Sequence, residues 1–196
     1  MGATLAAEVN SKLDVWLLGT AVSNAQVGIY ALASALFEGV MQLAVVLQNL
    51  VNPVLARKIA SGAREDAESI VRGTRRWFVP SLSGAALLGA ALYPLLIPPL
   101  IGDPDFIAGA WPFAILMVGV VLASPYLPFI QVLLMAALPG WHTGYVFATV
   151  AVSFAGNAAL IPLLGMRGAA LAAAASLVAS ALILRWLVRA RAGVRI

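Results

Sequence analysis

The chain has 196 residues, of which 62% are hydrophobic and 10% are charged, and its mean hydropathy is +0.97. Soluble domains contain about 45–50% apolar and about 25% charged residues, so this composition excludes an ordinary soluble domain, a disordered chain and a collagen-like chain. Cysteine is absent and His142 is the single histidine, which excludes a disulfide framework, a thiolate metal site and a multi-histidine metal site. We therefore expect an all-α, polytopic membrane protein without a metal or cofactor.

Charged and helix-breaking residues divide the apolar sequence into six runs, each about long enough to span a bilayer. The charged block 57–76 between the second and third runs predicts a short helical connector on the cytoplasmic side, in which Glu68 and Arg72 can pair. A solvated connector that sets the orientation is the favoured interpretation, and contact with lipid headgroups is the alternative. Residues 1–196 are thus expected to form one six-helix transmembrane bundle. Its predicted helices are 1–22, 27–56, 77–101, 107–137, 142–163 and 168–188.

The first predicted helix is atypical because it starts close to Met1 and carries Glu8, Asn10, Lys12 and Asp14. A secretory signal peptide has its positive charge before the apolar core and a cleavage site after it. Here acidic residues come first and the next apolar run is another span, so we reject a signal peptide. A start inside a gene and a fragment or split half of a longer protein remain as alternatives, and we favour the fragment.

Basic residues predict the orientation of the bundle, because lysine and arginine accumulate on the cytoplasmic side of membranes. The net charge is +4, and the basic residues lie between apolar runs, chiefly in 57–76 and 185–195, so no nucleic-acid partner is expected. Four predicted spans separate these segments, which places both of them, and both termini, in the cytoplasm. A break of the fourth helix into two spans at Ser124-Pro125 would place the C-terminal arginines outside, against the charge pattern.

The second predicted helix carries a narrow polar stripe on an otherwise apolar surface. At about 100° per residue, the side chains of Asn24, Ser34, Glu38, Gln42, Asn49 and Asn52 fall within about 80° of one another. The stripe forms either a hydrogen-bonded seam between helices or the wall of a hydrophilic pathway, and a carboxylate near mid-helix favours the pathway because its burial is costly. In the first helix, substrate contact and snorkelling to the membrane surface remain open. The candidate cavity-lining residues are Glu8, Lys12, Asp14, Ser34, Glu38, Gln42 and Asn49.

The last three predicted helices carry weaker signals. The polar residues of helix 142–163 fall within about 120° of one another, and packing is the favoured interpretation, with His142 at the membrane interface. Small residues in helix 168–188 predict close helix packing. Gln131 is a possible cavity residue. The polar residues of helix 142–163 are His142, Tyr145, Thr149, Ser153 and Asn157.

Four segments of the chain have a distinctive sequence. They are Leu13-Asp14-Val15-Trp16-Leu17-Leu18-Gly19, Val27-Gly28-Ile29-Tyr30-Ala31-Leu32-Ala33, Asn52-Pro53-Val54-Leu55-Ala56 and the stretch from Asn157 to Ala172, which follows the pattern N-x-x-L-I-P-x-x-G-x-x-G-A-A-x-A. Together they resemble bacterial polysaccharide flippases of the multidrug/oligosaccharidyl-lipid/polysaccharide exporter superfamily. The resemblance implies the C-terminal lobe of a two-lobed, twelve-helix transporter in the bacterial cytoplasmic (inner) membrane. Lipid-linked oligosaccharide would cross its central cavity by alternating access, in contact with membrane lipid. The N-terminal lobe is then apparently absent, or a separate partner, and the chain offers only Lys12 as a cation at depth.

Other functions remain open at this stage. A multidrug or cation exporter of the same superfamily would have an acidic, aromatic cavity, which Asp14 and Glu38 fit. A non-transporting membrane scaffold or remnant is the alternative of a different class. The chain lacks a Walker loop, G-x-S-x-G, H-E-x-x-H and a dinucleotide fingerprint, so we do not expect an enzyme.

Overall fold

The computed structural model describes residues 13–192, which form helices and turns without a strand in that range. Five helical segments within it are long and apolar enough to cross a membrane, so the coarse architecture is an all-α, multi-pass membrane bundle. Of the first predicted span, 1–22, the described residues contain the short helix α2, and residues 1–12 lie outside the described part of the chain. The helices are α2 (Leu13–Gly19), α3 (Asn24–Ala60), α4 (Arg64–Ile101), α5 (Ala110–Ala123), α6 (Val132–Met135), α7 (Pro139–Leu164) and α8 (Met166–Leu187).

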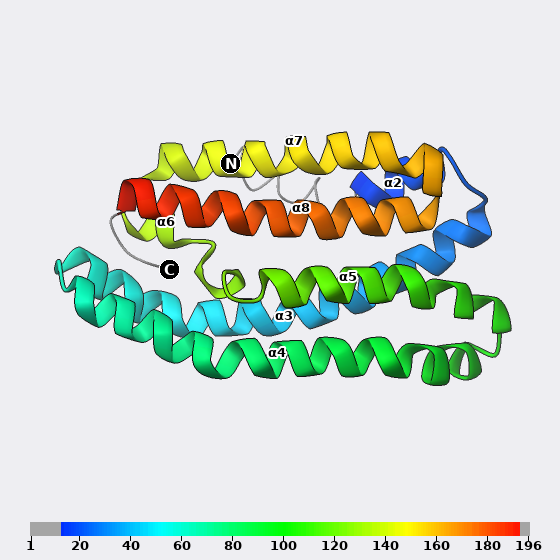
Figure 1. The fold of residues 1–196 in the computed structure, drawn as a ribbon, viewed down its shortest axis with the longest axis horizontal. Coiled ribbons are helices and arrows are strands. Elements are labelled where there is room, and N and C mark those ends of the chain that lie inside the picture. The colour runs from blue at the N-terminus through cyan, green and yellow to red at the C-terminus, as the bar shows by residue number, and fades with distance from the viewer. Residues whose placement is uncertain (1–12, 193–196) are drawn as a thin grey trace.

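The long helices run nearly parallel or antiparallel to one another along the long axis of the molecule (Figure 1). Helices α3 and α4 form an antiparallel hairpin, and α5 packs against both of them. Helix α8 lies between α5 and α7, and the short α2 packs against α7, α8 and α3. The bundle is therefore held together chiefly through α5 and α8, while α3 and α7 belong to opposite sides of it.

The predicted connector 57–76 is not a separate element, because helices α3 and α4 extend through it. Only Ser61, Gly62 and Ala63 separate the two helices, and Gly62 adopts a φ of 72°, which glycine tolerates best. Arg57 and Lys58 lie in the last turn of α3, and Glu65 and Asp66 lie in the first turn of α4, so each pair complements its helix dipole.

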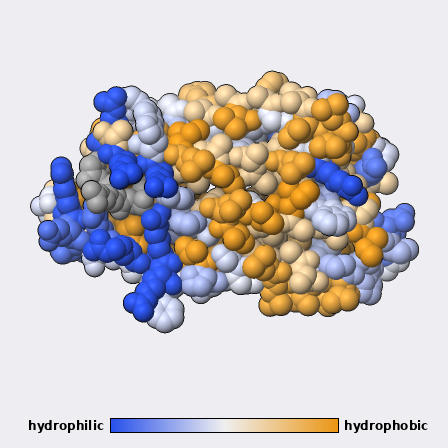
Figure 2. Space-filling view, in the orientation of Figure 1, coloured by the Kyte–Doolittle hydropathy of each residue, from blue (hydrophilic) through white to orange (hydrophobic). Residues whose placement is uncertain are grey.

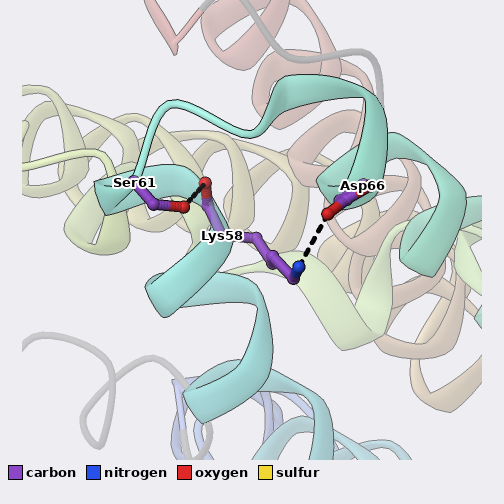
Figure 3. A network of polar contacts seen from close by, with 3 residues as sticks. All are labelled: Lys58, Ser61 and Asp66. Carbon is purple, nitrogen blue, oxygen red and sulfur yellow. Dashed lines mark hydrogen bonds and ion pairs between the residues drawn. The ribbon is translucent and has the colours of Figure 1, made fainter.

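Polar contacts close the tip of this hairpin. The Lys58 ammonium and the Asp66 carboxylate pair across the turn at 2.6 Å, and the Ser61 hydroxyl donates to the Lys58 carbonyl oxygen at 3.1 Å (Figure 3). The predicted Glu68–Arg72 pair is confirmed at 3.7 Å. At 1.5 Å per residue, α3 and α4 are each about 55 Å long, well beyond a bilayer core of about 30 Å. If the apolar part of the bundle spans the bilayer, the tip of the α3–α4 hairpin therefore extends out of the bilayer core.

The predicted helix 107–137 is interrupted, which corrects its expected bounds. A 3-10 turn, Pro104–Gly109, precedes α5, which ends at Ala123, and a second 3-10 turn, Leu127–Phe129, leads to α6. Proline lacks the backbone N–H and clashes with the preceding turn, so Pro125 and Pro128 end the helix here. The chain does not reverse into an extra span, because α6 remains at the end of the bundle where α7 begins (Figure 1).

Side chains of α3 and α4 bind the backbone that this break exposes. The Gln48 side-chain amide donates to the Leu127 carbonyl oxygen at 2.7 Å, and Arg75 Nε donates to the Pro125 carbonyl oxygen at 2.8 Å. The Arg75 guanidinium also lies 4.7 Å from the centre of the Tyr126 ring. An unpaired carbonyl inside a membrane protein is costly, so these contacts stabilise the broken segment.

We expect Arg75→Ala to lower the free energy of unfolding by about 1–3 kcal/mol, because it leaves the Pro125 carbonyl without its donor. Arg72→Ala, one turn earlier on α4, is the matched control. It removes only the exposed 3.7 Å pair with Glu68 and should change the stability by less than about 0.5 kcal/mol. Thermal unfolding of both variants in detergent, followed by circular dichroism, measures the difference. Equal stability of the two variants would show that Arg75 does not secure the break.

Small residues on α8 permit close packing, as predicted for helix 168–188. Gly168, Ala169, Ala170 and Ala172 are buried. A β-carbon on Gly119 of α5 would lie 2.9 Å from Ala174, and one on Gly156 of α7 would lie 3.3 Å from Ala172. Such approaches are available only where one partner lacks a side chain.

The two basic segments lie at the same end of the bundle. Hydrophilic residues gather where α3 turns into α4 and where α8 ends, and apolar residues cover the middle (Figure 2). Four spans, α4, α5, α7 and α8, separate the two segments, and this even number agrees with the sequence prediction that both segments lie on the same side of the membrane. That this end faces the cytoplasm stays a prediction.

Candidate functional site

A cavity of about 870 Å³ lies between α3 on one side and α7 and α8 on the other, with residues of α2 and α6 at its margin. Most of its lining is apolar, with Phe37, Met41 and Val45 from α3 and Leu177 from α8 among its walls. Polar and charged side chains interrupt this apolar wall, and several of them, such as Glu38 on α3 and Thr149 on α7, lie well inside helices that can span a membrane. An intramembrane position of this kind is a functional candidate by default, because polar groups there are expensive.

Helix α3 contributes Ser34 and Glu38 to the cavity wall. The two residues are one turn apart and thus share a face of the helix. Ser34 is buried, and Glu38 is half-buried. The core of the predicted stripe therefore faces the cavity, as the pathway interpretation requires.

Helix α2 contributes Asp14, whose carboxylate is 8% exposed. The Tyr30 hydroxyl of α3 donates to Asp14 Oδ2 at 2.5 Å, and the Val15 backbone N–H donates to Asp14 Oδ1 at 2.9 Å. Two donors therefore hold this carboxylate. Glu38 of α3 lines the same cavity, so two acidic side chains share its wall.

Helix α7 provides a second polar wall from residues for which packing was the favoured interpretation. His142, Tyr145, Thr149 and Ser153 line the cavity, together with Thr143. The first four of these residues recur at intervals of three or four, which places their side chains on one face of α7. Asn157 continues the same face but is fully buried, donates to the Ser153 carbonyl oxygen at 3.0 Å, and does not line the cavity.

Helix α8 adds Ser176 and Ser180, which the sequence assigned only to helix packing. The Ser176 hydroxyl approaches the Thr149 carbonyl oxygen at 3.4 Å and so links α8 to α7 at the cavity wall. The α8 residues of the lining are Ala173, Ser176, Leu177 and Ser180. Their spacing of three and four residues places both serines on the helix face that lines the cavity, and this spacing is the signal in the sequence. Gln131, before α6, lines the cavity as predicted and accepts a hydrogen bond from the Asn52 amide at 3.1 Å.

The remaining predicted site residues do not line this cavity in the described structure. Gln42 and Asn49 are exposed on α3, 60–80° from Ser34 by the helical geometry of about 100° per residue, and lie outside the lining. Only part of the polar stripe on α3 therefore lines the cavity. Glu8 and Lys12 lie outside the described residues.

The chemistry of the cavity follows from its lining. Hydroxyl groups, two carboxylates and one imidazole can donate to and accept from a polar cargo, and the apolar remainder can contact a hydrocarbon tail. Within residues 13–192, no lysine or arginine contributes to this lining, so the described wall favours neutral or cationic groups over anionic ones. The same part of the chain contains no cluster of three or more potential metal ligands.

The chain matches no protein-family model, no curated protein and no solved structure. Its similarity to polysaccharide flippases therefore stays a prediction made from the quoted segments. Residues 13–192 form an all-helical bundle of membrane-spanning dimensions, with a largely apolar cavity between two of its sides whose wall carries polar and acidic side chains.

Proposed function

We propose that this chain is one lobe of a membrane transporter that carries lipid-linked oligosaccharide across the bacterial cytoplasmic membrane by alternating access. The observation that supports this most directly is the cavity between α3 and the α7–α8 pair, because it collects hydroxyl and carboxylate groups at membrane depth. Sugars are recognised through such donors and acceptors. The apolar part of the lining suits the adjoining prenyl chain.

The same cavity supports a second candidate, the export of lipophilic cations. Asp14 and Glu38 are both acidic, and Phe37 and Tyr145 supply aromatic faces beside them. A pyrophosphate group would be repelled by two carboxylates unless cations came from Lys12 or from a partner lobe. A cation would need no such help, which is why this candidate is retained.

Binding to the purified protein in lipid nanodiscs distinguishes these functions. The probes are undecaprenyl diphosphate carrying an oligosaccharide, undecaprenyl phosphate without sugar, and tetraphenylphosphonium. We expect the oligosaccharide lipid to bind more tightly than the sugar-free lipid. Preferential binding of tetraphenylphosphonium would support the cation exporter, and binding of none of the probes would contradict both proposals and leave a structural role.

A further inference from the structure

The end of the bundle that contains the hairpin tip and the end of α8 is strongly basic. Within 57–76 and 185–191 there are nine basic residues and three acidic ones, Glu65, Asp66 and Glu68. Hydrophilic residues gather at this end in the space-filling view (Figure 2). We name this surface the basic end; its basic residues are Arg57, Lys58, Arg64, Arg72, Arg75, Arg76, Arg185, Arg189 and Arg191.

Internal contacts occupy only part of this charge. Lys58 pairs with Asp66, Arg72 pairs with Glu68, and Arg75 binds the broken backbone after α5. The guanidinium groups of Arg64, Arg76, Arg185 and Arg189 have no acidic partner among residues 13–192, and all four side chains are exposed. Folding therefore does not use these four charges, and they remain available to an anionic partner.

Three tryptophans lie beside arginines of the basic end. Trp77 follows Arg76 on α4 and is 74% exposed, and Trp186 follows Arg185 on α8 and is 64% exposed. Trp141, in the first turn of α7, contacts the Arg191 guanidinium at 4.3 Å from its ring centre.

Tryptophan is enriched where headgroups meet hydrocarbon, so these rings mark the membrane surface at the basic end. The neighbouring guanidinium groups then lie at the depth of lipid phosphates, which they can bind through two parallel hydrogen bonds. A soluble anion would contact only the arginines. A phospholipid would contact both groups, because its phosphate can bind the arginine and its headgroup–acyl boundary is where the indole ring lies. The repetition on α4, α7 and α8 places such pairs around the bundle.

We propose that the basic end is a binding site for anionic phospholipid headgroups of the phosphatidylglycerol type, with Arg76, Arg185 and Arg189 as its phosphate-binding residues. This site is separate from the cavity and independent of the cargo that the cavity carries. It would hold the hairpin tip and the end of α8 against one leaflet. Charge attraction and interfacial tryptophans act in the same direction there.

Electron spin resonance of spin-labelled lipids around the reconstituted protein tests this site. We expect spin-labelled phosphatidylglycerol to associate at least about threefold more strongly than spin-labelled phosphatidylcholine. The triple variant Arg76→Ala/Arg185→Ala/Arg189→Ala should lower this ratio to about one. In 1 M NaCl the wild-type ratio should also approach one, because the Debye length falls to about 3 Å.

A matched pair of variants on α8 supplies the control. Arg185 is in the last turn of α8 and Arg167 is in its first, so Arg185→Ala should lower the ratio while Arg167→Ala should leave it unchanged. Arg185→Lys should retain most of the preference, since the charge is kept. The proposal is overturned if the ratio survives both the triple variant and high salt, or if Arg167→Ala lowers it as much as Arg185→Ala does.

Discussion

Glu38→Gln is expected to raise the dissociation constant of the transported ligand by at least about tenfold, because a hydrogen bond to a charged group contributes about 1.5–3 kcal/mol. Glu38 is a carboxylate of the cavity wall on α3, and Asp14 of α2 lines the same cavity. Glutamine preserves the shape of the side chain and removes its charge. Binding of the oligosaccharide lipid and of tetraphenylphosphonium to the variant in nanodiscs measures the effect.

Glu65→Gln is the matched control, because Glu65 is exposed in the first turn of α4 at the hairpin tip, away from the cavity lining. This variant should bind both probes as the wild-type protein does. Wild-type affinity of Glu38→Gln for every probe that the unmodified protein binds would instead make the α3 stripe a packing seam. A loss in both variants would show that the effect is one of overall charge.

Gly168→Ala is expected to lower the melting temperature by about 2–12 °C. Gly168 lies in the first turn of α8, and a β-carbon there would collide with the Leu160 carbonyl group of α7 and lie 3.0 Å from the Ile161 nitrogen. Backbone atoms cannot move aside as a flexible side chain can, so the two helices would have to separate. Overpacking of this kind costs about 1–3 kcal/mol or more, and each kcal/mol corresponds to about 2–4 °C in a chain of this size.

Gly84→Ala is the control for this prediction. Gly84 is exposed within α4, and a β-carbon there would meet nothing within 4 Å, so alanine should be neutral or slightly stabilising through its higher helix propensity. Thermal unfolding of both variants in the same detergent gives the comparison. Equal melting temperatures would contradict the close backbone contact between α7 and α8.

Much of the fold follows from the sequence, because a membrane-spanning helix can be recognised as a long run of apolar residues. The bounds predicted for 142–163 and 168–188 lie within three residues of α7 and α8. A break at Ser124-Pro125 was considered only as a division into two spans and rejected, and the prolines inside other helices of this chain, including Pro53 and Pro94, show that proline alone does not identify a break. What makes Pro125 a break is the set of distant donors, Gln48 and Arg75, that bind the exposed carbonyls, and no local pattern reveals them.

The candidate site was predictable on α3, at Asp14 of α2 and at Gln131, whereas packing was the favoured interpretation for α7 and α8. A carboxylate such as Glu38 at mid-helix is costly and therefore conspicuous, whereas hydroxyls such as Thr149 and Ser180 can bond to their own helix and pack anywhere. The partner of Asp14 was also hidden. The Tyr30 hydroxyl reaches the Asp14 carboxylate from the next helix, and no local pattern in the sequence reveals this contact. Helical periodicity identifies faces, but it does not identify which faces leave a space between them.

Cysteine labelling along one turn of α8 tests the central claim most directly, which is that the cavity holds water and not lipid. The chain has no native cysteine, so single substitutions report without background. Ser180 lines the cavity, Ala181 is buried at 4% exposure, and Leu182 is 54% exposed on the outer surface. These three consecutive positions therefore sample the cavity, the core and the surface facing lipid.

The reagent is a membrane-impermeant, charged methanethiosulfonate, which reacts with ionised thiols in water. We predict that Ser180→Cys reacts rapidly in proteoliposomes, while Ala181→Cys and Leu182→Cys remain unmodified. All three variants should react once the protein is denatured, which verifies that each thiol is present. An unreactive Ser180→Cys, or a Leu182→Cys that reacts as fast, would contradict the account of a water-filled cavity between α3 and the α7–α8 pair.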